Sequence, residues 1–176
     1  MANIKKFYRA SSSITNVNNA GNLNVLATSS TLLAGWLSAV IDNTTDLDLD
    51  KIITGSIALG NAAVANGQIC VYAIAQLDDA AWPAAALTLG TFGLQGTGTF
   101  KDATNRDSGA VLVWAAGTRA DPGTDDVYQI AASSLAGAFG GILPSRCVLF
   151  VTHSTGVPLA ATGHQITVKG TYETVV

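Results

Sequence analysis

The sequence predicts an all-β protein with a single-domain antiparallel β-sandwich, jelly-roll-like, of about eight to nine strands with long inter-sheet loops. Three observations predict this fold. Segments with period-two alternation or β-branched residues recur along the chain. Clusters of Asn, Asp, Gly and Thr separate these segments at short spacing. No segment shows a sustained helical stripe with capping residues at its ends.

The expected strands are the segments with the strongest β pattern, which in chain order are Ile4–Ala10, Asn22–Ala27, Gly35–Ile41, Leu47–Leu59, Gln68–Gln76, Ala110–Ala115, Val127–Ala131, Cys147–Thr152 and Gln165–Thr174. Within 47–59 the alternation shifts near Ile52-Ile53 and Gly55, which predicts a β-bulge there. Turn-forming residues lie between the strands, at positions 16–22, 42–45, 66–67, 78–79, 121–123 and 162–163.

Two segments leave a helix open. Thr28–Val40 has an apolar helical face, so strand and helix stay equal alternatives there. Ser133–Phe139 could form one helical turn. Residues 78–105 and 116–126 are expected to be inter-sheet loops, and loops of such length are usually functional or bound to a neighbour.

The chain is expected to form one domain because no internal repeat or linker interrupts it, and 176 residues are enough for a self-sufficient core. Within it, residues 1–21 form an N-terminal arm with the first strand and a loop, and residues 22–176 form the β-sandwich. Residues 1–10 are expected to be dispensable for this fold.

Charge is scarce in this sequence. Only 12% of the residues are charged, against about 25% in an average soluble domain, while 48% are hydrophobic and the mean hydropathy is +0.35. Two explanations for the surface stay open: it is covered by Ser, Thr, Asn, Gln and Gly, or it is largely buried against other subunits.

Nucleic acid and membrane are not expected as partners. The formal net charge is −3, and neutralising phosphates needs clustered Lys and Arg. The apolar runs are far shorter than the roughly 20 residues that span a bilayer. The N-terminal segment has no apolar core behind its charges, so we expect synthesis in a cytoplasm without a signal peptide.

Three aspartates two residues apart, Asp46, Asp48 and Asp50, superficially suggest a calcium loop. That loop needs Gly at its sixth position and Glu at its twelfth, where this chain has Lys51 and Ile57. Because alternate residues of a strand share one face, we expect instead a solvent-facing acidic edge that deters the addition of another strand.

The histidines and cysteines do not form a catalytic pattern. His153-Ser154 and His164 lack a Gly-x-Ser-x-Gly nucleophile turn, so the histidines are expected to be structural or exposed. Cys70 and Cys147 lie in apolar runs and are expected to be buried thiols, although a disulfide between them stays open.

Other catalytic and ligand sites lack strong candidates too. The chain has one Glu and mostly turn-associated Asp, so paired acid and base carboxylates are missing. Trp36, Trp82 and Trp114 lie in apolar contexts, which favours core or interface roles over sugar stacking. We therefore expect no enzymatic activity, no cofactor and no metal site.

Several segments together resemble small structural virion proteins of tailed bacteriophages. The matching segments are Asn18-Asn19 through Leu23, Ile41–Thr45 with the alternating strand after it, Val71–Ala75 leading through Leu77-Asp78-Asp79 into Trp82-Pro83, Ala138–Pro144, Thr155–Ala160 and Lys169–Val175. The chain departs from the pattern between Thr97 and Asp126. The resemblance implies a sandwich protein of the particle, most like a capsid decoration or cement protein.

This resemblance leads to an expected function: a non-enzymatic decoration protein on the capsid surface of the virion. Its expected partners are the major capsid protein, whose lattice it binds and stabilises, and itself, as a homodimer or homotrimer. A tail or head-tail connector component and a carbohydrate- or receptor-binding module stay as alternatives.

The expected interface residues are Lys5, Lys6, Phe7, Tyr8, Arg9, Trp82 and Tyr172. The N-terminal five are suited to adding a strand to a neighbouring protein. Deleting residues 1–10 is therefore expected to weaken particle binding or oligomerisation.

Overall fold

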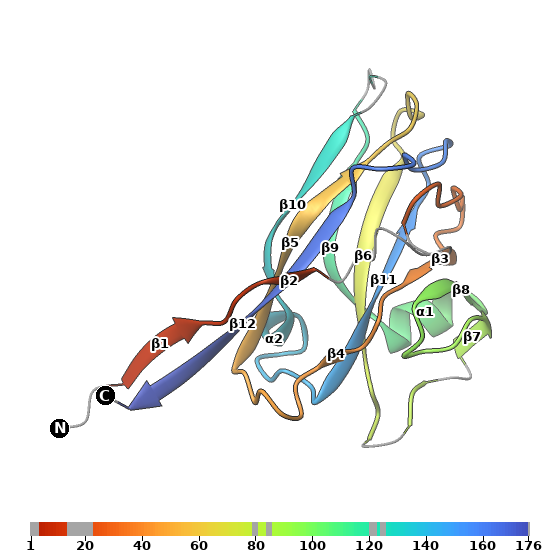
Figure 1. The fold of residues 1–176 in the computed structure, drawn as a ribbon. Helices are drawn as coiled ribbons and strands as arrows, with labels where there is room; N and C mark the ends of the chain where they lie inside the picture. The colour runs from red at the N-terminus through yellow and green to blue at the C-terminus, as the bar shows by residue number, and fades with distance from the viewer. Residues whose placement is uncertain are drawn as a thin grey trace.

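The fold is a sandwich of two antiparallel β-sheets (Figure 1). The computed structural model describes residues 4–13, 23–78, 81–83, 86–119, 123 and 126–175. Strands account for 47% and helices for 8% of the structure, so the predicted all-β sandwich is confirmed. The predicted turn at residues 16–22 and the boundary between residues 21 and 22 lie outside the described residues.

The first sheet has five strands: β1 (Ile4–Tyr8), β2 (Ser12–Ser13), β5 (Asp50–Ala58), β10 (Val127–Ser134) and β12 (Gln165–Val175). Their order is β1-β12-β5-β10, with β2 also beside β12. At the centre, a Cβ on Gly55 of β5 would overlap the carbonyl oxygen of Gln165 in β12. Gly55 therefore permits the close approach of these two strands.

The second sheet has seven strands: β3 (Ala34–Leu37), β4 (Ile41–Asp42), β6 (Gln68–Ala75), β7 (Leu87–Leu89), β8 (Gly96–Phe100), β9 (Val111–Gly117) and β11 (Arg146–His153). Their order is β7-β8-β3-β11-β6-β9, with β4 also beside β11. From β9 onward, successive strands alternate between the two sheets, so each sheet is built from segments distant in sequence, as in a jelly roll.

Apolar side chains fill the space between the sheets and also cover the outer face of the seven-stranded sheet. The inter-sheet core includes Trp36, Ile53, Ile57, Ile69, Val71, Leu149, Val151 and Ile166. A second cluster includes Leu37, Tyr72, Ile74, Phe92, Phe100, Val148 and Phe150. Strands β6 and β11 contribute to both clusters, which explains why their sequences are continuous apolar runs.

Two short helices complete the described fold. Helix α1 (Ala103–Gly109) begins after Asp102, whose carboxylate accepts a hydrogen bond from the Asn105 backbone at 2.8 Å. Helix α2 (Leu135–Ala138) begins after Ser134 and lies within the predicted helical turn, which is confirmed. No helix in the described part of the chain is long and apolar enough to cross a membrane.

The structure corrects two sequence-based expectations about elements and decides one that was left open. Residues 23–27 do not form the predicted strand, because the chain turns there and Val25 has a φ of 52°. The expected loop at 78–105 contains β7, β8 and the start of α1. Within 28–40, the open alternative between strand and helix is settled in favour of strand β3.

The irregularity predicted near Gly55 exists, but the extra residue lies in the neighbouring strand. Pairing of β5 with β12 continues without a break from Asp50 to Ser56. The register of β10 against β5 shifts between Ile130 and Ser133, opposite the segment between Gly55 and Ile53. The alternation of the β5 sequence thus predicted the bulge at the correct level of the sheet, but in β5 instead of β10.

Candidate functional site: the terminal ribbon

The feature that sets this sandwich apart is a two-stranded projection made by the two ends of the chain. Residues 4–8 of β1 pair with residues 171–175 of β12, from Ile4 opposite Val175 to Tyr8 opposite Thr171. The pairing between β5 and β12 covers residues 165–171 of β12. Residues 4–8 and 171–175, here called the terminal ribbon, therefore run out of the body of the molecule (Figure 1).

One face of the terminal ribbon is aromatic. Phe7 and Tyr172 stack with their ring centres 5.7 Å apart, and the Arg9 guanidinium lies 4.8 Å from the centre of the Tyr172 ring. Alternate residues of a strand share a face, so Tyr172 continues the row of the buried core residues Ile166 and Val168. The core-facing side of the sheet thus extends onto the ribbon, where Phe7 is 37% exposed.

The opposite face of the terminal ribbon carries both apolar and charged side chains. Ile4 and Tyr8 are each 66% exposed. Lys6 lies 3.7 Å from Glu173, and the Lys169 ammonium lies 5.1 Å from the centre of the Tyr8 ring. Such exposed pairs contribute little to stability, so they leave the basic side chains available for contacts with other molecules.

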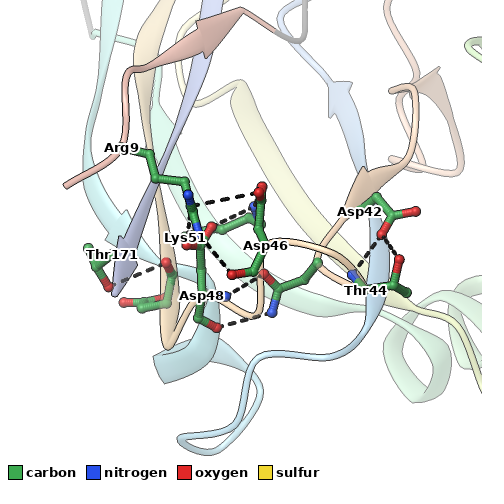
Figure 2. Close-up of polar contacts among 9 residues, drawn as sticks. Arg9, Asp42, Thr44, Asp46, Asp48, Lys51 and Thr171 are labelled. Atoms are coloured by element: carbon green, nitrogen blue, oxygen red, sulfur yellow. Dashed lines mark hydrogen bonds and ion pairs between the residues drawn. The ribbon is translucent and has the colours of Figure 1, made fainter. Parts of the chain in front are cut away.

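An ion cluster holds the base of the ribbon against the body. Asp48, whose side chain is fully buried, lies 2.9 Å from the Lys51 ammonium and 2.6 Å from Arg9 Nε. Asp46 is a further acid, 3.5 Å from Lys51 and 3.8 Å from Arg9. We call Arg9, Asp46, Asp48 and Lys51 the basal ion cluster (Figure 2). It joins the end of β1 to β5 and to the loop before β5.

Backbone contacts place the ion cluster beside β12. The Arg9 N–H donates to the Gly170 carbonyl at 2.9 Å, and the Leu49 N–H donates to the Thr171 carbonyl at 2.8 Å. A Cβ on Gly170 would overlap the Asp48 carboxylate. Gly170 is thus the position in β12 that leaves room for the buried acid.

The loop before β5 is folded by its own polar side chains. The Asn43 side chain accepts a hydrogen bond from the Asp48 N–H at 2.9 Å and donates one to the Asp48 carbonyl at 3.0 Å. Asp42 accepts hydrogen bonds from the Thr44 hydroxyl and N–H, which lower the pKa of Asp42 to about 2. The Asn43 contacts hold the Asp48 backbone within this loop.

The predicted solvent-facing acidic edge is therefore wrong for Asp48. Strand β5 begins only at Asp50, and Leu47 has a φ of 50°, so the period-two rule does not apply to Asp46 and Asp48. Burial acts to raise the pKa of Asp48, but the hydrogen bonds from Lys51 and Arg9 outweigh it and hold that pKa below its usual value. The hydrogen bond to Asp48 in turn raises the pKa of Arg9.

The structure brings most of the predicted interface residues together. The terminal ribbon contains Lys5, Lys6, Phe7, Tyr8 and Tyr172, and Arg9 lies at its base. Trp82 is not part of this set: it follows β6 and stacks on Phe92 at 5.9 Å. Sequence reasoning missed that Asp48 and Lys51 hold Arg9 at the base of the ribbon. The one signal in the sequence was Gly170, because a glycine within a strand often marks the close approach of another group.

A second exposed surface lies along β9 and β10, the outermost strands of the two sheets on one side of the sandwich. Neither strand contains a charged residue. Leu112 is 51% exposed and Val127 is 52% exposed. Edge strands of soluble proteins are usually protected by charge, so these two are open to pairing or packing with another molecule.

Both histidines have structural hydrogen bonds. His153 Nε2 lies 3.0 Å from the Leu26 carbonyl, and His164 accepts from the Ala58 N–H at 3.2 Å while its Nε2 donates to the Ala160 carbonyl at 2.8 Å. Burial lowers the pKa of each histidine. The described residues include no group of three His, Cys, Asp or Glu side chains placed to hold a metal ion.

The two cysteines are buried free thiols, which confirms the favoured expectation and settles the open question of a disulfide in this structure. Burial raises the pKa of Cys147 to about 12 and also raises that of Cys70. Neither thiol is therefore activated as a nucleophile.

Comparisons with known proteins assign no family. No protein-family model and no curated protein matches the chain. Among solved structures, T=1 particles derived from infectious bursal virus align with 98% of this chain and 40% of that chain, at 10% identity and a TM-score of 0.16. The chain thus spans less than half the length of that protein, and at this TM-score the likeness carries no argument.

Proposed function

We propose that this protein is a non-enzymatic structural component of a tailed-phage virion, a decoration or cement protein that binds the major capsid protein lattice and stabilises the head. The terminal ribbon is the observation that carries this proposal. The resemblance of the sequence to small virion proteins supplies the kind of particle.

The terminal ribbon supports an assembly role because it is incomplete alone. Two-stranded β structures are marginally stable in water unless another layer or strand packs on them. Phe7 and Tyr172 continue a core face without enough cover to bury it, and Ile4 and Tyr8 are exposed on the other face. A partner that covers these side chains would complete the sandwich layer.

The β9–β10 edge supports the same role independently. It is uncharged, carries exposed apolar side chains and is formed by strands other than those of the terminal ribbon. A protein with two separate docking surfaces can engage two neighbours in a lattice at once. Linked contacts of modest strength then give a high overall avidity.

The composition agrees with a molecule that is largely surrounded by neighbours. Only 12% of its residues are charged, and exposed apolar residues are spread over the described surface, including Leu47, Leu77, Leu94 and Ile142. A lattice-bound protein can tolerate this surface because contacts with its neighbours remove part of it from water.

The decisive experiment is to separate purified heads from tails and to measure which fraction holds the protein and in what number of copies. We expect stoichiometric binding to expanded heads, and a lower head melting temperature when the protein is absent. Recovery of the protein with tails while heads lack it would contradict the proposal and favour a tail or connector component.

A truncated variant tests whether the terminal ribbon contributes to head binding. Deleting residues 1–8 removes β1 and keeps Arg9 for the basal ion cluster. We expect head occupancy to fall at least about tenfold while the unfolding midpoint of the free protein changes little. Normal occupancy by the truncated protein would exclude β1 as the docking element.

The glycan-binding alternative is tested by tryptophan fluorescence. Trp36 is fully buried, whereas Trp82 lines a pocket of about 200 Å³ with Leu87 and Phe92. A sugar bound in this pocket would change the emission of Trp82. Unchanged fluorescence across a panel of glycans is the result expected for a decoration protein.

A further inference from the structure

The charges of this chain are divided unequally between the terminal ribbon with its base and the rest of the molecule. Residues 1–10 and 165–176 hold four basic side chains, Lys5, Lys6, Arg9 and Lys169, and one acidic one, Glu173. Residues 11–164 hold five basic and eleven acidic side chains. By these counts the terminal segments carry a formal charge of +3 and the body −6. Arg9, Asp46, Asp48 and Lys51 pair with one another in the basal ion cluster. Without these four residues the division is +2 against −5.

From this division we infer that the terminal ribbon docks on the acidic body of a second copy of this chain, in a head-to-tail contact. This inference rests on the proposed function, which makes the ribbon an assembly site. The inference adds that the partner of the ribbon is a second copy of the chain. Opposite charges on the two surfaces would steer the encounter and fix its orientation.

The aromatic face provides the apolar centre of such a contact. Phe7 and Tyr172 form this face, and the exposed Ile4 and Tyr8 add apolar surface on the opposite face. These residue types form the centre of interfaces, and Lys5 and Lys6 would lie around them as a polar rim. Among the described residues Lys5 takes part in no ion pair, and the Lys6–Glu173 pair is exposed. Both lysines are thus available to acids of a partner.

The ribbon is directed away from its own body, so the acidic body that it can reach belongs to another molecule (Figure 1). The basal ion cluster fixes this direction, because Arg9 is held by the buried Asp48. A projection that is already ordered loses less conformational entropy on binding. Docking of one ribbon on another is disfavoured because each carries a net positive charge.

A contact between two different surfaces leaves one molecule with an unused body surface and the other with an unused ribbon. Repetition of the contact closes a ring when the rotation between copies allows it. A rotation that does not close gives an open filament instead. In either assembly the inference predicts that inner copies both donate and receive a ribbon.

The test uses the isolated full chain and no capsid protein. Sedimentation velocity over a range of concentrations is measured at about 50 mM and about 500 mM NaCl. We expect concentration-dependent self-association that weakens at the higher salt concentration. A monomer at every concentration and both salt concentrations would overturn the inference, even if the protein still binds heads through the acidic surface of a capsid protein.

Two charge-reversal variants locate the contact. K5E/K6E reverses the ribbon lysines, and K101E/R119E makes the same change in net charge at two exposed basic residues of the body. We expect K5E/K6E to raise the dissociation constant at least about tenfold, whereas K101E/R119E leaves it unchanged or lowers it, because the body becomes more acidic. Equal weakening by both variants would overturn the inference.

A photo-crosslinking amino acid in place of Phe7 distinguishes head-to-tail docking from ribbon pairing. We expect intermolecular cross-links from position 7 to peptides within residues 23–164 of the second copy. Cross-links confined to residues 1–10 or 165–176 would show pairing between ribbons and would overturn the inference. Since no particles are present, failure here is separate from failure of the head-binding proposal.

Discussion

At the scale of single residues, Asp48 joins the ends of the chain to the sandwich. Its buried carboxylate forms ion pairs with both Lys51 and Arg9, and the Lys51 side chain is only 7% exposed. Removing one member of a buried ion pair leaves the other charge without compensation, which costs more than the net contribution of the pair.

We therefore expect Asp48→Asn to reduce the free energy of unfolding at pH 7 by about 3 kcal/mol, measured by urea denaturation. The folded pKa of Asp48 is lowered from the usual 3.8, so its contribution is present above that value and is lost as the pH falls below it. The difference between wild type and variant should shrink in acid. Asp107→Asn is the control: the Asp107 side chain, which pairs with Arg106, is 60% exposed, so its replacement should cost less than about 1 kcal/mol. Equal costs for both variants would contradict the role of Asp48.

The buried histidines make stability depend on pH near neutrality. Burial lowers the folded pKa of His153 and His164 from the usual 6.5, so below that value the unfolded chain binds more protons than the folded one. Stability is then fully present above about pH 6.5 and is lost as the pH falls, by up to about 1.4 kcal/mol per pH unit for each histidine.

Urea denaturation between about pH 7 and pH 5 checks this expectation. His164→Gln should give a less steep decline than wild type, because one of the two titrating groups is gone. A wild-type stability that is constant over this range would show that the histidines keep their usual pKa values in the fold.

At the scale of elements, β12 depends on a glycine where it passes the basal ion cluster. In Gly170→Ala the new methyl group would overlap the Asp48 carboxylate. We expect a loss of about 2 kcal/mol in unfolding free energy and faster proteolysis of the terminal ribbon. The matched control is Gly109→Ala, where a Cβ would meet nothing within 4 Å. Resistance of the ribbon in Gly170→Ala to protease would contradict this account.

The elements that the sequence predicts well are those with strong local patterns. Strands β6, β11 and β12 are long runs of alternating or continuously apolar residues, and each was expected near its observed bounds. Strands β7 and β8 were missed because Leu87–Leu89 is short and Gly96–Phe100 is rich in Gly and Thr. Their strand conformation depends on pairing with each other and with β3, which no local pattern records.

The candidate site was predictable in part for the same physical reason. The cluster of Lys5, Lys6 and Arg9 with two aromatics is visible in the sequence, and it lies in the ribbon and at its base. The partner of Arg9 is 39 residues away in a turn that interrupts the alternation of the aspartates. Such a long-range ion pair becomes visible only when the loop before β5 and the base of β12 are placed in space.

At the scale of the whole molecule, the reactivity of the two thiols measures whether the sandwich unfolds as one cooperative unit. Cys70 and Cys147 are 4% and 1% exposed and lie in the adjacent strands β6 and β11. A thiol reagent should therefore label the native protein at least about 1,000-fold more slowly than the urea-unfolded chain, because labelling requires global unfolding. Cys70→Ala isolates Cys147, and rapid labelling of either thiol would reveal local opening of the seven-stranded sheet.

The pairing of β1 with β12 has a consequence for biosynthesis. The partner of β1 is made after about 160 further residues have left the ribosome, since Tyr8 pairs with Thr171. A polypeptide that stops before residue 171 can pack much of the sandwich and still lacks the strand against which β1 forms the terminal ribbon. Translation thus completes the ribbon only after residues 9–170 have been made. A growing chain therefore cannot join an assembly through the ribbon before the body of the molecule has been synthesised.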